Sequence, residues 1–341
     1  MKVSIIGIDL AKNVFQVTAL NRGGKPIMNR AVRRARLLDL IRQFEPTVLA
    51  MEACGSSHYW GRLFRDMGHD VRLLPPQHVK PFVRVNKTDA GDAVAICEAA
   101  QRPNIRFVSI KSIPQQDLRL LNRQRMRLIR LRTGTANQIR GFAREYGVFF
   151  PIGYRQLLTD LPSALEDGDN ELSVIARHTL WELYQELNEF TEKIQRLQAQ
   201  LVELAKSQES FERLQEVPGF GPVVSAAYLG AVADGQQFHN GRQSAAWLGL
   251  VPRLNGSGGR TQTLSITKNG DRELRAMLVH GARAVVRWAD RRDDRMGKWI
   301  QQLKSRRGTN KTVVALANKM ARIAWVIVAR GERFDMNKAF S

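Results

Sequence analysis

The sequence predicts an α/β domain at the N-terminus, then a helical coiled-coil linker, then a mainly α-helical C-terminal domain. Three observations support this fold class. The first hundred residues alternate short apolar runs with amphipathic stretches, the middle carries a heptad repeat, and the last third has apolar helical stripes separated by glycine turns. A chain of 341 residues can build two or three cores. We expect the boundaries at residues 1–105, 106–210 and 211–341.

The N-terminal segment should begin with three strands before its first long helix. Each later strand is short, apolar and bounded by turn residues, and Thr88 is the expected N-cap of the last helix. The expected strands are residues 3–8, 14–20, 26–32, 47–51 and 71–74, and the expected helices are 37–44, 59–67 and 88–100. Three leading strands followed by αβαβα is the order of an RNase H-like fold.

Four carboxylates stand at the ends of these elements. Asp9 follows the first strand, Glu52 follows the fourth, and Asp89 and Asp92 lie three residues apart on one helix face. Brought together, they would repel one another unless hard cations lay between them, and Mg²⁺ prefers such oxygen ligands. Two ions about 3.5–4 Å apart can hold the attacking and leaving oxygens of a phosphodiester. The pattern therefore predicts metal-dependent phosphoryl transfer, and a metal-free role as surface charges and caps is the alternative.

The net charge of +21 predicts a polyanionic partner, for which nucleic acid is the common case. A merely soluble basic protein is the alternative. The two cysteines, Cys54 and Cys97, have no metal-ligand spacing, which favours a reducing cytoplasmic compartment. No signal peptide is recognisable and no uninterrupted apolar run reaches membrane-spanning length, so we expect no membrane association.

An arginine-rich helix is predicted over residues 114–147. Arg123, Arg127 and Arg130 lie outside its partial apolar stripe, and the arginine fork matches phosphate oxygens, so we expect these three to contact nucleic acid. A solvated helix face is the alternative. Residues 149–169 hold prolines, glycines and acidic residues and should form a loop or turn region.

A heptad repeat follows, in which spacings of four and three alternate. We expect a coiled-coil hairpin with the 114–147 helix that also serves for assembly. Its apolar positions are Leu183, Leu187, Phe190, Ile194, Leu197, Leu201 and Leu204.

The C-terminal segment opens with Gly219 and Gly221 between two helical stretches. This resembles a helix–hairpin–helix, in which glycines let backbone N–H groups approach a phosphate, although a simple helical turn is the alternative. A helix at 238–248 precedes a polar loop that holds Ser257, Arg260 and Lys268. The cations would polarise a phosphate beside the hydroxyl, but composition alone favours an ordinary flexible turn. Two basic helices, 271–289 and 309–330, should close the chain.

Over nearly its full length the chain resembles the insertion-sequence-110 family of transposases, also called DEDD transposases. The motifs IIGIDLAK, MEACGSS and NKTDAGDA are similar to the family's RuvC-like N-terminal domain. Those similar to its C-terminal transposase domain are VPGFGPVVSAAYL, RQSAAWLGLVPRLNGSGGR and ITKNGDRELRAML. The GSGGR loop and the chain length resemble the subgroup named after insertion sequence 1111.

The resemblance implies that Asp9, Glu52, Asp89 and Asp92 bind Mg²⁺, for which Mn²⁺ substitutes, and that Ser257 is a nucleophile acting on DNA. It also implies a noncoding bridge RNA that pairs with donor and target DNA, in a bacterial cytoplasm close to the nucleoid. Cutting two duplexes implies a homo-oligomer, a dimer or tetramer. Because no general base stands near Ser257 in the sequence, we expect a composite site with the carboxylates. The competing hypotheses are a junction-resolving nuclease that uses water and a non-enzymatic nucleic-acid-binding protein.

Overall fold

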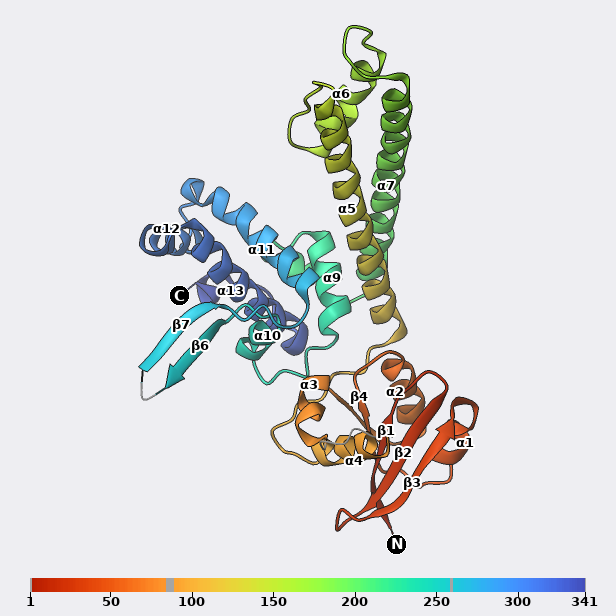
Figure 1. The fold of residues 1–341 in the computed structure, drawn as a ribbon. Coiled ribbons are helices and arrows are strands. Elements are labelled where there is room, and N and C mark those ends of the chain that lie inside the picture. The colour runs from red at the N-terminus through yellow and green to blue at the C-terminus, as the bar shows by residue number, and fades with distance from the viewer. Residues whose placement is uncertain (1, 84–88, 258–259, 341) are drawn as a thin grey trace. The chain divides into compact units, whose positions relative to one another are not determined.

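The computed structural model describes residues 2–83, 89–257 and 260–340 (Figure 1). The chain divides into two compact units. The first comprises Met1–Ile113 together with Ala233–Asn240. The second comprises Pro114–Val232 together with Gly241–Ser341.

A five-stranded mixed sheet is the centre of the first unit. Its strands are β1 (Val3–Asp9), β2 (Val14–Asn21), β3 (Pro26–Arg33), β4 (Val48–Glu52) and β5 (Asp70–Leu74). They lie in the order β3-β2-β1-β4-β5. The first three strands pair antiparallel, whereas β4 pairs parallel with both β1 and β5. All five strands were expected from the sequence to within two residues at each end, and this mixed sheet fits an RNase H-like domain.

Helices cover both faces of this sheet (Figure 1). On one face, α1 (Leu37–Ile41) and α2 (Ser57–Asp66) pack on the core that contains Ile6 and Ile8. On the other, α3 (Pro76–Val79) and α4 (Asp89–Ala100) pack on the core that contains Ile5. Short 3₁₀ turns occupy Arg34–Arg36 and Lys80–Phe82. Thr88, the expected N-cap of α4, lies outside the described residues.

Two long antiparallel helices, α5 (Ile113–Glu145) and α7 (Val174–Lys206), lie side by side in the second unit (Figure 1). Arg125 Nη2 donates to Gln198 Oε1 at 3.3 Å, and Thr135 Oγ1 donates to Glu186 Oε2 at 3.3 Å. The heptad of α7 has a buried line at every seventh residue, formed by Leu180, Leu187, Ile194 and Leu201. The two helices therefore pair within one chain, and a true coiled-coil geometry stays a prediction.

The prediction of a loop over 149–169 is wrong, because residues Tyr154–Glu166 form α6. Leu157 and Leu161 are one helical turn apart and fully buried beside α7. Pro162 lies inside this helix and removes one backbone donor. The guanidinium of Arg177, on α7, donates to the carbonyl of Leu165 at 2.6 Å. Packing against α7 and the hydrogen bond from Arg177 thus stabilise a helix here, although the proline and the acidic residues favour a loop.

The rest of the second unit is mainly helical, as expected. Its helices are α8 (Ser210–Gln215), α9 (Pro222–Val232), α10 (Gly241–Trp247), α11 (Arg272–Arg287), α12 (Arg295–Arg307), α13 (Thr309–Arg330) and α14 (Met336–Ala339), with a 3₁₀ turn at Ala289–Arg291. The helix expected from residue 238 begins three residues later. The sequence analysis missed α12 because only Met296, Gly297 and Ile300 of this basic helix are buried.

Helix α13 is long and apolar enough, by length and composition, to cross a membrane. No membrane-spanning run was expected here, because the apolar stretch at 320–329 is too short by itself to cross a membrane. Half of it is buried in the protein, where Leu316 and Met320 are fully enclosed. It contacts α10, α11 and α12. These contacts are those of the core helix of a helical domain.

The polar loop expected over 253–270 is instead mostly a β-hairpin. Strand β6 (Pro252–Ser257) pairs antiparallel with β7 (Arg260–Ile266), and Ser257 is the register partner of Arg260. Threonines at 261 and 263 and Ile266 favour a strand. The glycines at 256, 258 and 259 favoured a loop from composition alone.

Candidate active site

Asp9 and Glu52 stand at the ends of neighbouring parallel strands. The last pair in the β1–β4 register is Ile8 with Met51, so each carboxylate is the next residue on its own strand. Side chains alternate across a sheet. Because Ile8 and Met51 belong to the core under α1 and α2, the alternation places Asp9 and Glu52 on the α4 face.

The thiol of Cys54, two residues after Glu52, lies close enough to both carboxylates to be influenced by their charges. Partial burial, and then the negative charges of Glu52 and Asp9, raise the pKa of this thiol above its ordinary value. Both carboxylates are half-buried. Two like charges in one partly buried place favour a cation beside them.

Helix α4 approaches β1 closely because Gly7 has no side chain. A Cβ at Gly7 would lie 2.5 Å from both the carbonyl oxygen of Ala93 and the sulfur of Cys97. This contact brings the first turns of α4, where Asp89 and Asp92 lie, onto the strand that ends at Asp9. The sequence analysis missed Gly7, although a glycine inside a buried strand is a signal for such an approach.

Asp92 carries the observation that bears most directly on metal binding. Its Oδ1 is buried and has no hydrogen-bond partner among the described residues. A buried carboxylate oxygen without a donor is costly unless a cation or donor satisfies it. The residues present therefore fit a divalent cation held by oxygen ligands.

The structure describes only part of the predicted metal site. The structure describes the side chains of Asp9, Glu52 and Asp92, whereas Asp89 is described only as the first residue of α4. Among the described side chains, no three acidic, histidine or cysteine residues lie close enough to hold one ion. The strands bring Asp9 and Glu52 together, and α4 adds Asp92 on the same face.

Ser257 and Arg260 face each other in the register at the tip of the β6–β7 hairpin. Their side chains lie outside the described part of the chain. Lys268 is exposed just beyond β7, in a left-handed backbone conformation with φ of 57°, and its N–H donates to the carbonyl of Gly249 at 3.1 Å.

The foot of the hairpin is fastened to the end of α10 by Arg275. This buried arginine of α11 donates to the carbonyls of Leu248 at 3.0 Å and Asn269 at 2.6 Å. The described strand residues 252–256 and 262–265 are all exposed. The hairpin thus projects from a fixed base.

Tyr59 and Tyr228 are the tyrosines to consider as nucleophiles in place of Ser257, and they differ in exposure. Tyr228 is fully buried, its hydroxyl donates to the carbonyl of Ala321 at 3.4 Å, and burial raises its pKa. It cannot reach DNA without unfolding α9. Tyr59 is 46% exposed and lies on α2, shortly after Glu52, so only Tyr59 stays a realistic alternative to Ser257.

The arginines predicted to bind nucleic acid divide into two kinds. Arg130 forms an ion pair with Glu273 at 2.9 Å, and Arg119, on the same face of α5, pairs with Asp271 at 2.9 Å. Arg123 and Arg127 are exposed, and their guanidinium groups have no ion pair with any described residue. Arg123 and Arg127 therefore remain open to phosphate, whereas Arg130 also ties α5 to α11.

The two glycines between α8 and α9 also differ. Gly219 has φ of 92°, and a Cβ there would lie 2.7 Å from Met320 Cε and 3.1 Å from the backbone of Gly281. Gly221 is exposed, with no atom within 4 Å of such a Cβ. Gly219 is thus required by packing inside the protein, and Gly221 alone presents an open backbone. A helix–hairpin–helix function for this turn stays a prediction.

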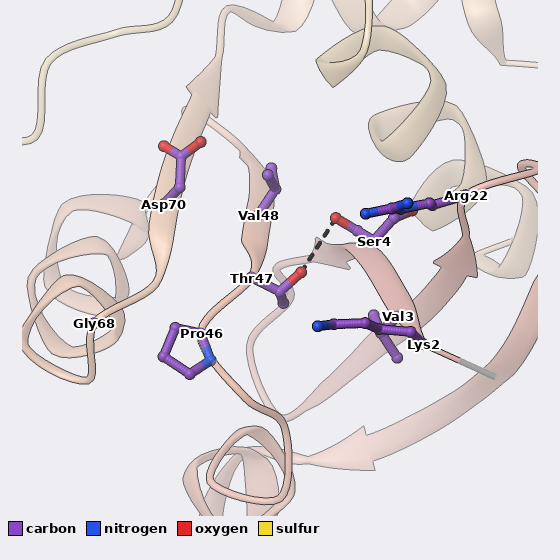
Figure 2. A pocket seen from close by; sticks show the side chains of 9 residues that line it. All are labelled: Lys2, Val3, Ser4, Arg22, Pro46, Thr47, Val48, Gly68 and Asp70. Atoms are coloured by element: carbon purple, nitrogen blue, oxygen red, sulfur yellow. Dashed lines mark hydrogen bonds between the residues drawn. The ribbon is translucent and has the colours of Figure 1, made fainter.

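Figure 2 shows a surface pocket at the beginning of strands β1, β4 and β5. Lys2, Arg22 and Asp70 line it, and Thr47 Oγ1 donates to the carbonyl of Ser4 at 3.1 Å. It adjoins the first residues of β1 and β4, whereas Asp9 and Glu52 end these strands. This pocket is separate from the candidate active site.

Comparison with known proteins identifies the family of this chain. Residues 6–148 match a family model described as a transposase of the DEDD, IS110 type, and residues 211–296 match one described as the transposase IS116/IS110/IS902 family. The transposase for insertion sequence element IS1111A of Coxiella burnetii is 40% identical over 97% of this chain and 91% of its own. The chain belongs to the IS110 family of transposases.

Two further relatives of this transposase extend over almost the whole chain. A Pseudomonas aeruginosa protein named "Probable family 20 transposase" is 43% identical over 97% of this chain and 98% of its own. The transposase for insertion sequence element IS1328 of Yersinia enterocolitica is 34% identical over 98% and 99%. Membership makes the chain a DNA transposition enzyme whose substrates are DNA, and a divalent metal is usual for DEDD-type transposases.

Proposed function

We propose that this IS110-family transposase cuts and rejoins donor and target DNA through a covalent bond between Ser257 and a DNA phosphate. The serine hydroxyl would attack the phosphodiester, forming a Ser257–phosphate ester and releasing a DNA hydroxyl end. Attack by a second DNA hydroxyl would reverse the step and join new strands. The phosphodiester is conserved at each stage, so no external energy source is needed.

The buried, unpartnered Oδ1 of Asp92 beside the ends of β1 and β4 is the observation that carries the metal half of this proposal. Asp9, Glu52, Asp89 and Asp92 would hold Mg²⁺ or Mn²⁺. When bound, such an ion neutralises charge on the scissile phosphate. Arg260 and Lys268 would add positive charge beside the serine, and the open Arg123 and Arg127 would contact nucleic-acid backbone.

We further propose that a noncoding bridge RNA directs the enzyme to its DNA. A net charge of +21 suits the binding of two polyanions at once. Base pairing would then supply sequence, and the protein would bind RNA shape and phosphates. Sequencing of RNA that copurifies with the protein tests this. One defined noncoding species from beside the element is expected, and random fragments would contradict the proposal.

The serine chemistry is tested with end-labelled DNA, guide RNA and Mg²⁺ on a denaturing gel. The wild type should leave a protease-sensitive DNA adduct, and Ser257→Ala should leave none. Ser265→Ala is the matched control, since Ser265 lies on β7 of the same hairpin and its hydroxyl accepts a hydrogen bond from Arg253 Nη2 at 3.3 Å. Free 5′-phosphate ends without adduct would instead indicate a nuclease that uses water. An adduct formed by Ser257→Ala would direct attention to Tyr59.

Two duplexes must be cut, so we propose that the active assembly is a dimer or tetramer. The half-buried heptad line Leu183, Phe190, Leu197 and Leu204 of α7 leaves apolar surface for contact between copies. Sedimentation with and without nucleic acid measures the assembly state. A monomer that remains fully active at the lowest concentrations would contradict this.

A further inference from the structure

An exposed tryptophan at the end of α11 is unlike the other aromatic side chains of the C-terminal helices. Trp288 is 50% exposed, whereas Trp325 in α13 is 5% exposed. The backbone N–H of Trp288 donates to the carbonyl of Val285 at 3.1 Å, so the last turn of α11 holds the residue firmly. Singly exposed apolar side chains are common, so the case for a binding surface rests on the charged groups that surround this indole.

Two guanidinium groups lie over the Trp288 ring. The Cζ of Arg291 is 4.5 Å from the ring centroid and that of Arg287 is 5.8 Å from it. Neither guanidinium forms an ion pair with any residue that the structure describes. The nearby Asp290 is engaged by Lys304 at 2.8 Å. The charge beside this ring is therefore uncompensated.

Exposed polar and charged side chains continue along the same face of α11. His280, Arg283 and Arg287 are exposed at spacings of three and four residues, while Leu278, Ala282 and Val286 are buried on the opposite side. A positive helix face that ends in an exposed indole combines a track for phosphates with a surface on which a base can stack.

Trp181 shows what a similarly exposed tryptophan looks like without these features. It is 45% exposed on α7, stacked on Tyr184 with ring centroids 5.3 Å apart, and followed by Glu182. Among the described residues no cation lies over its ring. Trp288 therefore differs from Trp181 in the two arginines that lie over its ring.

We propose that Trp288, Arg287 and Arg291 bind an unpaired nucleotide of a single-stranded nucleic-acid segment. The base stacks on the indole or on the guanidinium plane already over it, and the arginine charges contact the flanking phosphates. In a duplex the base faces are covered by their neighbours, so the indole selects single strands. The inference goes beyond the serine chemistry and does not depend on it.

Binding of fluorescent single-stranded oligonucleotides and of a duplex of the same length to the full chain tests this. Trp288→Ala should weaken single-strand binding by at least about fivefold, which is the lower end of what stacking on one aromatic ring contributes per base. Trp288→Phe should recover most of the loss, and duplex binding should change little. Parallel DNA and RNA probes reveal which polymer supplies the unpaired base.

The control is Trp181→Ala, which should bind every probe as the wild type does. Arg287→Ala with Arg291→Ala should also make binding less salt-dependent, with a slope smaller by about 0.7 for each lost phosphate contact on a single strand. Trp288→Ala should leave that slope unchanged. Wild-type single-strand affinity in Trp288→Ala, or an equal loss for duplex and single strand, would overturn the proposal. A thermal melt confirms that each variant is folded.

Discussion

The two halves of the proposed chemistry are built in opposite ways. The carboxylates stand on a sheet with hydrophobic cores on both faces, and the sheet register and the Gly7 contact fix their backbone. Ser257 stands on a two-stranded hairpin whose described strand residues are exposed and whose support is concentrated at its foot. Folding therefore fixes the backbone positions of the carboxylates. We expect the position of Ser257 to become fixed only when substrate binds.

The largest effect should come from the buried carboxylate. Asp92→Asn should lower DNA cleavage at least about 100-fold, because an amide holds a divalent cation far less well than a carboxylate does. Asp39→Asn, at an exposed position of α1, is the control. Without metal, Asp92→Asn should melt no lower than the wild type, since it removes a charge whose buried Oδ1 has no hydrogen-bond partner among the described residues. Undiminished cleavage, or a marked loss of stability, would assign Asp92 a structural role.

A second effect tests the foot of the hairpin. Arg275→Ala should reduce adduct formation and lower the free energy of unfolding by about 1–3 kcal/mol, because two backbone carbonyls lose their donor. Arg272→Ala changes the exposed neighbour three residues earlier and should do neither. Equal adduct yields from Arg275→Ala and the wild type would show that the hairpin needs no such anchor.

The two glycines of the α8–α9 turn should respond differently. Gly219→Ala should lower the free energy of unfolding by about 1–3 kcal/mol, since its φ is positive and its Cβ would meet Met320 and Gly281. Gly221→Ala should cost much less, and chemical denaturation compares the two. If Gly219→Ala were as stable as the wild type yet bound DNA poorly, Gly219 would have a role in phosphate binding rather than in packing.

The arginines of α5 should show a smaller separation of roles. Arg123→Ala with Arg127→Ala should weaken nucleic-acid binding several-fold and reduce its salt dependence, with the melting temperature unchanged. Arg119→Ala should instead lower the melting temperature, because it breaks a partly buried ion pair with Asp271. Affinity measured at several salt concentrations distinguishes them. Equal changes in affinity and in melting temperature for both variants would contradict the assignment of Arg123 and Arg127 to binding and of Arg119 to stability.

The smallest effect concerns pH and the first unit. His69 is buried and accepts the N–H of Thr47 at 3.2 Å, and burial lowers its pKa below the ordinary value. The unfolded chain therefore binds the proton more readily, so stability should fall as pH drops below about 6.5. His69→Gln should flatten that slope in melting experiments. A wild-type stability independent of pH from 7 to 5 would contradict this.

Sequence reasoning succeeded where periodicity and core burial agree. The five strands of the first unit were placed within two residues, because short apolar runs between turn residues leave few alternatives. It failed for α6 and for the β6–β7 hairpin, where Pro162 and the glycines at 256, 258 and 259 signal loops locally. Partners distant in sequence, such as Arg177 for α6 and Arg275 for the hairpin foot, decide these segments.

The candidate residues show the same division. The sequence placed Asp9 and Glu52 at strand ends, but it contained no sign that Arg130 pairs with Glu273 or that Gly219 packs on Gly281. Both contacts join helices far apart in the chain, and only tertiary structure reveals them. Residue type and spacing therefore indicated the chemistry. Whether a given arginine or glycine binds nucleic acid or packs inside the protein could be decided only from the tertiary structure.

The central claim is that the carboxylate-held metal and Ser257 act on one phosphate. DNA with sulfur in place of a non-bridging oxygen at the scissile phosphate tests it, because sulfur binds Mg²⁺ poorly and the softer Mn²⁺ better. We predict that wild-type adduct formation falls with this DNA in Mg²⁺ and recovers in Mn²⁺, and that Ser257→Ala forms no adduct in either. Adduct yields indifferent to both sulfur and metal would contradict the claim.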